Sequence, residues 1–180
     1  MKKFFYGGLT AIVGGSLIVM LAALVIGRMG FIPVNADAVP SVLEKNLFPL
    51  VVRSAVARQS SVQGDGAALT DDDLVSGARI YRELCAGCHG QLSGRASVLG
   101  ASFYPPAPQL PGRGTSYNQA EVFWIVKHGI RNTSMPAWRN LLSDEDLRQV
   151  SAFVGAIDSL PATVEAKLRE DATERDKAKD

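Results

Sequence analysis

The sequence has only two cysteines and two histidines, and neither sign of charge dominates, since 19 Lys and Arg stand against 18 Asp and Glu. Two cysteines exclude the disulfide framework of a small secreted protein. A formal net charge of +1 gives no electrostatic reason to expect nucleic acid, whose phosphates select concentrated Lys and Arg. We therefore expect no nucleic-acid partner.

Charge is absent from residues 4–27, a stretch long enough to cross a hydrocarbon core of about 30 Å as a helix. Lys2 and Lys3 precede it, and such basic flanks tend to stay in the cytoplasm. The A-x-A arrangement at 36–38 permits a cleaved signal peptide instead, although the apolar part of such signals usually runs about 7–15 residues. We predict a transmembrane anchor, or an uncleaved signal, over residues 1–30, and each interpretation exports the remainder.

Residues 31–69 are predicted to form a linker, because prolines and glycines interrupt any single long helix there. Ser41 can cap a segment in which apolar residues recur at roughly helical spacing, with a kink expected at Pro49. This segment is either an amphipathic helix resting on the membrane or on the domain, or a partly ordered tether. We place the start of the folded domain near Thr70.

Capping patterns predict three helices in the domain, which we assign to residues 70–160. Thr70 and three aspartates begin the first, which continues to the cysteine segment. The second runs from about Asn118 to Lys127 and stops at Gly129, and the third begins at Ser143.

No alternating strand pattern competes with these helices, so the fold class is predicted to be all-α. The stretch 90–115 is rich in glycine and proline and is expected to be loop. Residues 161–180 mix acidic and basic side chains with few large apolar ones, and we expect this charged C-terminal tail to be an exposed or frayed helix.

Cys85-Ala86-Gly87-Cys88-His89 is a C-x-x-C-H sequence, the attachment signature of a c-type haem. Two thiols at this spacing can reach the two vinyl groups of one porphyrin edge, and His89 can then offer a ring nitrogen to the iron. A thioredoxin-like redox pair would want strands nearby, and a zinc site would need His128 as its last ligand. We expect one covalently attached haem c.

Met135 is the domain's candidate for the second axial ligand, because the other three methionines lie in or beside the apolar stretch. A loop methionine before Pro136 is poorly suited to helix packing, although core filling stays an alternative. Coordination by Met and His raises the reduction potential and suits electron transfer. His128 is the rival ligand, but its place beside Gly129 favours a surface or capping role.

Residues 73–160 resemble a monohaem class I cytochrome c domain. The segments that carry the resemblance are Gly77-Ala78-Arg79-Ile80-Tyr81, Cys85-Ala86-Gly87-Cys88-His89-Gly90, Phe123-Trp124-Ile125-Val126-Lys127-His128-Gly129-Ile130 and Met135-Pro136-Ala137-Trp138. The resemblance implies a cytochrome c fold in which Cys85 and Cys88 form thioethers, His89 is the proximal ligand and Met135 the distal one. His89 and Met135 are thus the expected metal ligands.

The resemblance also implies that Gly77 and Tyr81 lie where the first helix crosses the last, opposite Phe153 or Val154. That role is packing.

The family usually has a proline whose carbonyl accepts a hydrogen bond from the proximal histidine, which orients the ring. Pro105, Pro106 and Pro108 all qualify by position, and our choice is Pro106.

Trp124 either packs in the core or lies near the haem edge, where its indole N–H reaches a propionate. Arg113 and Arg131 are also candidates for neutralising propionates, but most basic residues of the domain must be solvated, and we leave both out of the core site.

With its anchor, the chain looks like the small tethered cytochromes that carry electrons in bacterial respiratory chains. The resemblance implies a single-pass protein of the inner membrane, held in lipid by the N-terminal helix, with its haem domain in the periplasm. Membrane respiratory complexes or dehydrogenases would be its electron donors and acceptors. One alternative is a haem c subunit of a larger dehydrogenase or terminal oxidase, and another is a gas sensor or haem enzyme with an open distal face.

Overall fold

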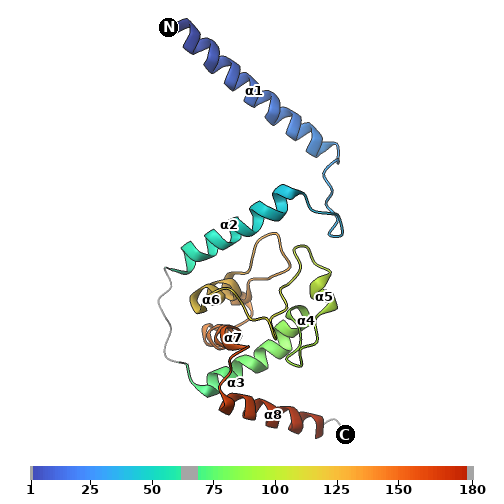
Figure 1. The fold of residues 1–180 in the computed structure, drawn as a ribbon, viewed down its shortest axis with the longest axis vertical. Coiled ribbons are helices and arrows are strands. Elements are labelled where there is room, and N and C mark those ends of the chain that lie inside the picture. Colours follow the sequence, from blue (N-terminus) through green and yellow to red (C-terminus); the bar gives the residue numbers. More distant parts are fainter. Residues whose placement is uncertain (1, 62–68, 178–180) are drawn as a thin grey trace. The chain divides into compact units, whose positions relative to one another are not determined.

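The computed structural model describes residues 2–61 and 69–177, and its regular elements in those ranges are all helical. This confirms the predicted all-α class. The elements in chain order are α1 (Lys2–Arg28), α2 (Val42–Ser60), α3 (Asp71–Ile80), a π-helical turn (Tyr81–Cys85), α4 (Ala86–His89), α5 (Val98–Ala101), α6 (Gln119–His128), a 3-10 turn (Trp138–Asn140), α7 (Asp144–Ala156) and α8 (Ala162–Lys177) (Figure 1). The chain divides into two units, Met1–Ala38 and Val39–Asp180.

The first unit is built on α1. Its segment Ala11–Arg28 is long and apolar enough to cross a membrane. Large apolar side chains along it, such as Ile12 and Ile18, are exposed. Length, composition and exposure are those expected of a helix whose surroundings are lipid.

The helices of the second unit begin where their capping residues predict. α3, α6 and α7 each start with a capping box, in which the cap side chain and the side chain three residues later each accept from the other's backbone N–H. The pairs are Thr70 with Asp73, Asn118 with Glu121, and Ser143 with Asp146. α6 ends at Gly129, as predicted from the sequence.

The core is organised by the crossing of α3 over α7. A Cβ atom at Gly77 would lie 2.2 Å from the carbonyl oxygen of Gln149 and 2.8 Å from the Cβ of Phe153. Tyr81 and Phe153 are fully buried beside this point, with ring centroids 5.6 Å apart. The expected crossing is therefore present, and Phe153 is the residue opposite Gly77 and Tyr81.

The C-terminal segment forms a helix, α8, whose described side chains are mostly exposed, as expected from the sequence, but one face of it packs against α3, which was not predicted. Val164 is fully buried, and Leu168 one turn later packs against the same cluster. Lys167 forms an ion pair of 2.6 Å with Asp72 on α3. Two apolar residues four positions apart suffice to attach α8, and composition alone hides that spacing.

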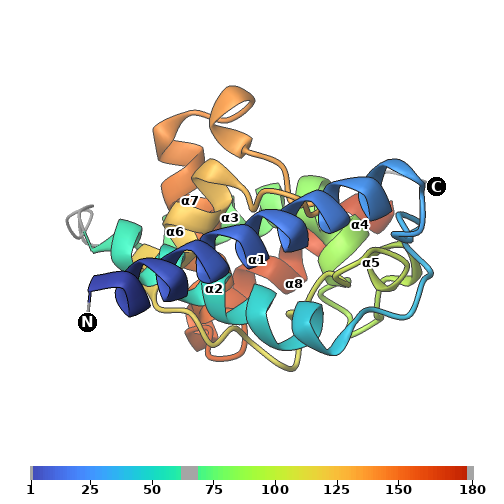
Figure 2. The same cartoon turned by 90° about the horizontal axis from the view of Figure 1, so that it is seen from above.

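The linker helix α2 packs on the domain, which decides between the interpretations of that segment. Ser41 caps it and Pro49 lies inside it, as predicted from the sequence. Its Val56 is 1% exposed, and α2 runs over α6 in both views (Figures 1 and 2). The Arg53 guanidinium donates a hydrogen bond of 3.1 Å to Ser116 Oγ in the loop before α6.

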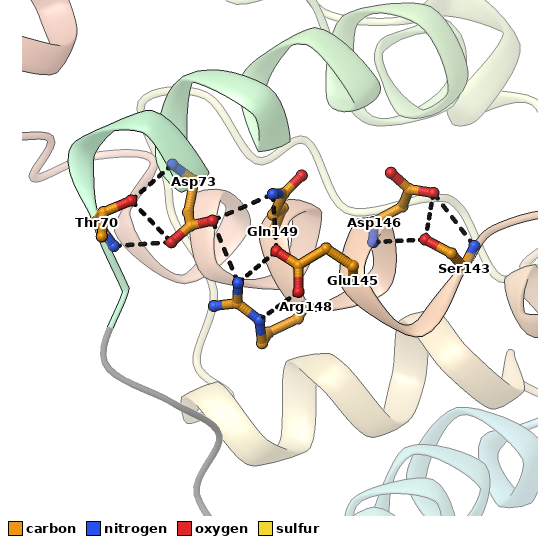
Figure 3. A network of polar contacts seen from close by, with 7 residues as sticks. All are labelled: Thr70, Asp73, Ser143, Glu145, Asp146, Arg148 and Gln149. Carbon is orange, nitrogen blue, oxygen red and sulfur yellow. Dashed lines mark hydrogen bonds and ion pairs between the residues drawn. The ribbon is translucent and has the colours of Figure 1, made fainter.

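A polar network ties the first turn of α3 to α7 (Figure 3). The Asp73 carboxylate accepts hydrogen bonds of 2.9 Å from both the backbone N–H and the hydroxyl of Thr70. Gln149 and Arg148 of α7 donate to its other oxygen at 3.1 and 3.2 Å. The bonds from Thr70, followed by those from Gln149 and Arg148, outweigh burial and lower the pKa of Asp73 to about 2.

We expect Asp73→Asn to destabilise the domain by about 1 kcal/mol near neutral pH, because the neutral amide loses charge-assisted hydrogen bonds. The folded-state pKa lies below the unfolded one, so the carboxylate stabilises the fold above about pH 4 and that stabilisation is lost as the pH falls toward 2. Urea unfolding of wild type and variant from pH 6 to pH 2 should show the difference shrinking below pH 4. Glu174→Gln, on the exposed face of α8, is the control, and a difference that stays constant with pH would contradict the prediction.

A second expectation concerns the helix crossing. Gly77→Ala should lower the free energy of unfolding by about 1–3 kcal/mol, because the new methyl group meets backbone of α7 that cannot move aside. Gly155→Ala on α7 is the matched control, since its Cβ would meet only the flexible end of Gln119. Denaturant unfolding should rank Gly77→Ala well below Gly155→Ala, and equal stabilities would argue against a tight crossing.

Candidate functional site

One apolar cavity in the second unit collects the four residues predicted to bind the cofactor, namely Cys85, Cys88, His89 and Met135. Its walls come from α4, the loops on either side of α6, α6 itself and α7. The other lining residues are Leu84, Phe103, Pro105, Pro106, Ala107, Pro108, Leu110, Thr115, Tyr117, Val122, Ile125, Val126, Ile130, Thr133, Ser134, Pro136, Trp138, Val150 and Val154. Segments up to about 70 residues apart in the chain thus share one site.

The cysteine segment is presented by a π-helical turn, where the sequence predicted a continuous helix. The backbone N–H of Ala86 donates to the carbonyl of Tyr81, five residues earlier. Such single π turns inside helices often occur at functional sites. Cys85 and Cys88 are both free thiols and both half-buried.

His89 is held by the carbonyl of Pro108, to which its Nδ1–H donates at 2.9 Å. Our choice of Pro106 is wrong, because the carbonyl is selected by the path of the loop, and three prolines within four residues look alike in sequence. Pro106 lines the cavity instead. With Nδ1 as the donor, the lone pair of Nε2 is available for a metal.

Loop residues that were not identified from the sequence form hydrogen bonds and close contacts with the backbone of the cysteine segment. The Gln109 amide donates to the Cys88 carbonyl at 3.1 Å, and its oxygen accepts from the Ser97 backbone at 2.6 Å. A Cβ at Gly100 in α5 would lie 1.8 Å from the same Cys88 carbonyl oxygen. The stretch 90–115, predicted as loop, therefore contains the short helix α5 and packs closely on the cysteine segment. The sequence contains no local pattern that predicts this packing.

Met135 reaches the cavity from a loop that closes against the end of α6. The Ile130 N–H donates to the Met135 carbonyl at 3.2 Å, and the Met135 N–H donates to Thr133 Oγ1 at 3.1 Å. Gly129 has a φ of 67°, and a Cβ there would lie 2.6 Å from the Met135 carbonyl oxygen. Gly129 therefore has a second role besides ending α6. Because it has no side chain, the backbone of Met135 and Pro136 can lie directly against it.

The structure bears on the alternatives left open for Trp124 and His128, and it agrees with the favoured role of His128 away from the cofactor site. Among the described residues, the cavity walls include neither Trp124 nor His128, whose rings pack on each other with centroids 5.0 Å apart. Burial, followed by the charges of Arg139 and Lys127, lowers the pKa of His128. The tryptophan on the cavity wall is Trp138, which the sequence patterns did not single out for a place beside the cofactor.

Arg113 and Arg131 are exposed and do not line the cavity in the part of the chain that the structure describes. Their exclusion from the core site agrees with the structure.

The alternative chemistries of the cysteine pair fit the site poorly. Burial, followed by the neighbouring Cys88, raises the pKa of the Cys85 thiol to about 12, whereas a redox-active C-x-x-C pair needs a thiol with a lowered pKa. Over residues 2–61 and 69–177, no three His, Cys, Asp or Glu side chains come together as a metal site would require. A thioredoxin-like pair and a zinc site both lose support.

The same residues fit a c-type haem. The cavity is lined mainly by aliphatic, aromatic and proline side chains, which suit a large apolar plate. Both thiols and the oriented His89 ring belong to one segment, while the thioether of Met135 comes from another. The cavity therefore offers one imidazole nitrogen, one thioether sulfur and two thiols, which are groups that can ligate and attach a c-type haem.

Comparison with known proteins points the same way. Residues 72–154 match the family described as cytochrome C oxidase, cbb3-type, subunit III. Cytochrome c6 of Synechococcus elongatus is 32% identical over 82 residues, which are 46% of this chain and 87% of that protein. Cytochrome c6 of Thermosynechococcus vestitus is also 32% identical over 82 residues, covering 46% of this chain and 68% of that protein. Chloroplastic cytochrome c6 of Chlamydomonas reinhardtii is 27% identical over 106 residues, which are 59% of this chain and 69% of that protein.

The close approach at Gly129 leads to a prediction about the Met135 loop. Gly129→Ala should cost about 1–3 kcal/mol of stability beyond the penalty for a positive φ, because its methyl group meets the backbone of Met135 and Pro136. Gly94→Ala is the matched control, since Gly94 also has a positive φ but nothing lies within 4 Å of its Cβ. Hydrogen exchange should speed up over residues 130–137 in Gly129→Ala alone, and equal effects in both variants would refute the contact.

Proposed function

The chain belongs to the class I c-type cytochromes, and from this premise we propose that it is a membrane-tethered electron carrier with one haem c, covalently bound, and His/Met axial ligation. The observation that carries the proposal is that Cys85, Cys88, His89 and Met135 all line one apolar cavity. The family itself makes the chain a haem c electron carrier. What we propose beyond family membership is the identity of the iron ligands, the presence of a single haem and the attachment to a membrane.

Each residue has a distinct part in this proposal. When bound, the haem supplies an iron that exchanges one electron between its ferric and ferrous states. Cys85 and Cys88 would form the thioethers, His89 would bind the iron through Nε2, and Met135 would bind the other face. The Pro108 carbonyl keeps the His89 ring oriented by accepting a hydrogen bond from its Nδ1–H.

The apolar walls of the cavity suit electron transfer. They exclude water from the cofactor, and low exposure to solvent together with Met/His ligation favours a high reduction potential. With His89 and Met135 both bound to the iron, neither redox state would gain or lose a ligand, and the rearrangement that accompanies each electron would be small.

We propose that α1 tethers the carrier to the bacterial inner membrane as a single-pass anchor with the haem domain in the periplasm. Support comes from the apolar segment Ala11–Arg28 and from Lys2 and Lys3 before it, which the positive-inside rule keeps in the cytoplasm. Respiratory complexes or dehydrogenases of the same membrane would be its donors and acceptors. A tether raises the effective concentration of the carrier at such partners.

A second candidate is a haem c subunit of a larger dehydrogenase or terminal oxidase. One observation favours it, namely that the matching family is described as an oxidase subunit. Mild solubilisation followed by gel filtration separates the candidates, because a subunit elutes with a large catalytic chain and a mobile carrier elutes alone.

The test of the proposed site is spectroscopic. Coexpressed with haem-attachment machinery, the full chain should show covalent haem and the weak far-red band of ferric iron bonded to methionine sulfur. Met135→His should abolish that band and lower the reduction potential, by only part of the roughly 0.8 V that axial ligands of all kinds span, because imidazole donates more strongly than thioether.

His128→Gln is the control and should retain both the band and the potential. Covalent haem without the band in the wild type, together with carbon monoxide binding, would overturn Met135 ligation and favour an open distal face.

A further inference from the structure

The helix α2 lies outside residues 72–154, which the family match covers, and its two sides are both apolar. One side is docked, with Val56 and Ser60 buried and Phe48 and Val52 half-buried. Arg53 adds a cation–π contact with Tyr117, whose ring lies 5.5 Å away and lines the haem cavity. These contacts set which side of α2 faces the domain.

The other side carries an open stripe, which we define as Leu43, Leu47 and Leu50. Positions i, i+4 and i+7 share one face of a helix, and this face is opposite to the docked one. Leu43 is 70% exposed and Leu50 is 62% exposed. Single exposed leucines are ordinary, but a row of them on a docked helix marks an interaction surface.

We propose that the open stripe of α2 lies against the lipid surface of the membrane that α1 crosses, an inference that rests on the proposed tether. The chain between the two helices supports it. Residues 29–41 can span at most roughly 45 Å when fully extended, so α2 is confined near the bilayer. Phe31 and Ile32, directly after α1, are also large, apolar and exposed.

The charges of α2 favour lipid over a second copy of the chain. The helix carries Lys45, Arg53 and Arg58 against the single acidic residue Glu44, a formal charge of +2 from three basic residues and one acidic one. Lys45 lies on the other side of the helix and Arg53 is bound to Ser116 and Tyr117, whereas Arg58, eleven residues after Leu47, lies on the face of the open stripe. The net positive charge of the whole helix favours the surface of a bilayer that contains anionic headgroups. Two copies facing each other through this helix would bring like charges together.

The test uses photo-crosslinking in the full-length, haem-loaded protein, reconstituted in vesicles of phosphatidylcholine and phosphatidylglycerol. A diazirine amino acid replaces Leu47 in one sample and Lys45 in the matched control. Lys45 is also exposed but lies two residues away, on the other side of the helix. We expect lipid adducts at position 47 to exceed those at position 45 several-fold. A probe at Leu50 repeats the measurement should the first variant fold poorly.

The possible outcomes separate this inference from the proposed function. Crosslinks from position 47 to another protein chain, or to water alone, overturn the lipid contact. If, in that case, the protein still floats with the vesicles after a high-salt wash and keeps its haem spectrum, the proposed tether and carrier function remain supported although the contact between α2 and lipid is refuted. Failure to float overturns the tether and this inference together.

Discussion

The close approach of α3 and α7 at Gly77 is the constraint on which the rest of the domain depends. It brings the backbone of α7 against α3 and stacks Phe153 on the buried Tyr81. The Tyr81 hydroxyl then donates to the Gly90 carbonyl at 2.8 Å, directly after the cysteine segment. Helix packing is thereby transmitted to the residues that attach and ligate the cofactor.

Beyond the cysteine segment, the site is formed by loops whose positions are fixed by contacts with backbone atoms. The Pro108 carbonyl orients His89, Gln109 supports Cys88, and Gly129 leaves room for the Met135 segment. The first two contacts are hydrogen bonds that pair the His89 ring and the Cys88 carbonyl, and the third is a close approach of backbone that only a residue without a side chain allows. A long loop region rich in proline and glycine can therefore remain ordered beside an apolar cavity.

Two helices enlarge the domain beyond the segment shared with the family. α8 closes on α3 through Val164 and an ion pair, while α2 lies over α6 and touches the loop that carries Tyr117. Because α2 contacts Tyr117 of the cavity wall and is joined along the chain to α1 by residues 29–41, it links the proposed haem site to the proposed tether. Its docked face sets the direction of the open stripe.

The sequence by itself determined the local features, since a capping residue, a C-x-x-C-H run or an apolar stretch acts within a few neighbouring residues. The starts of α3, α6 and α7, the all-α class and the family were all predictable in this way. Only the tertiary structure decided that Pro108 holds His89, that Trp138 and not Trp124 lines the cavity, and that α2 and α8 are docked. Those outcomes depend on the path of loops between distant helices, and no local pattern encodes which of several similar residues that path brings to the site.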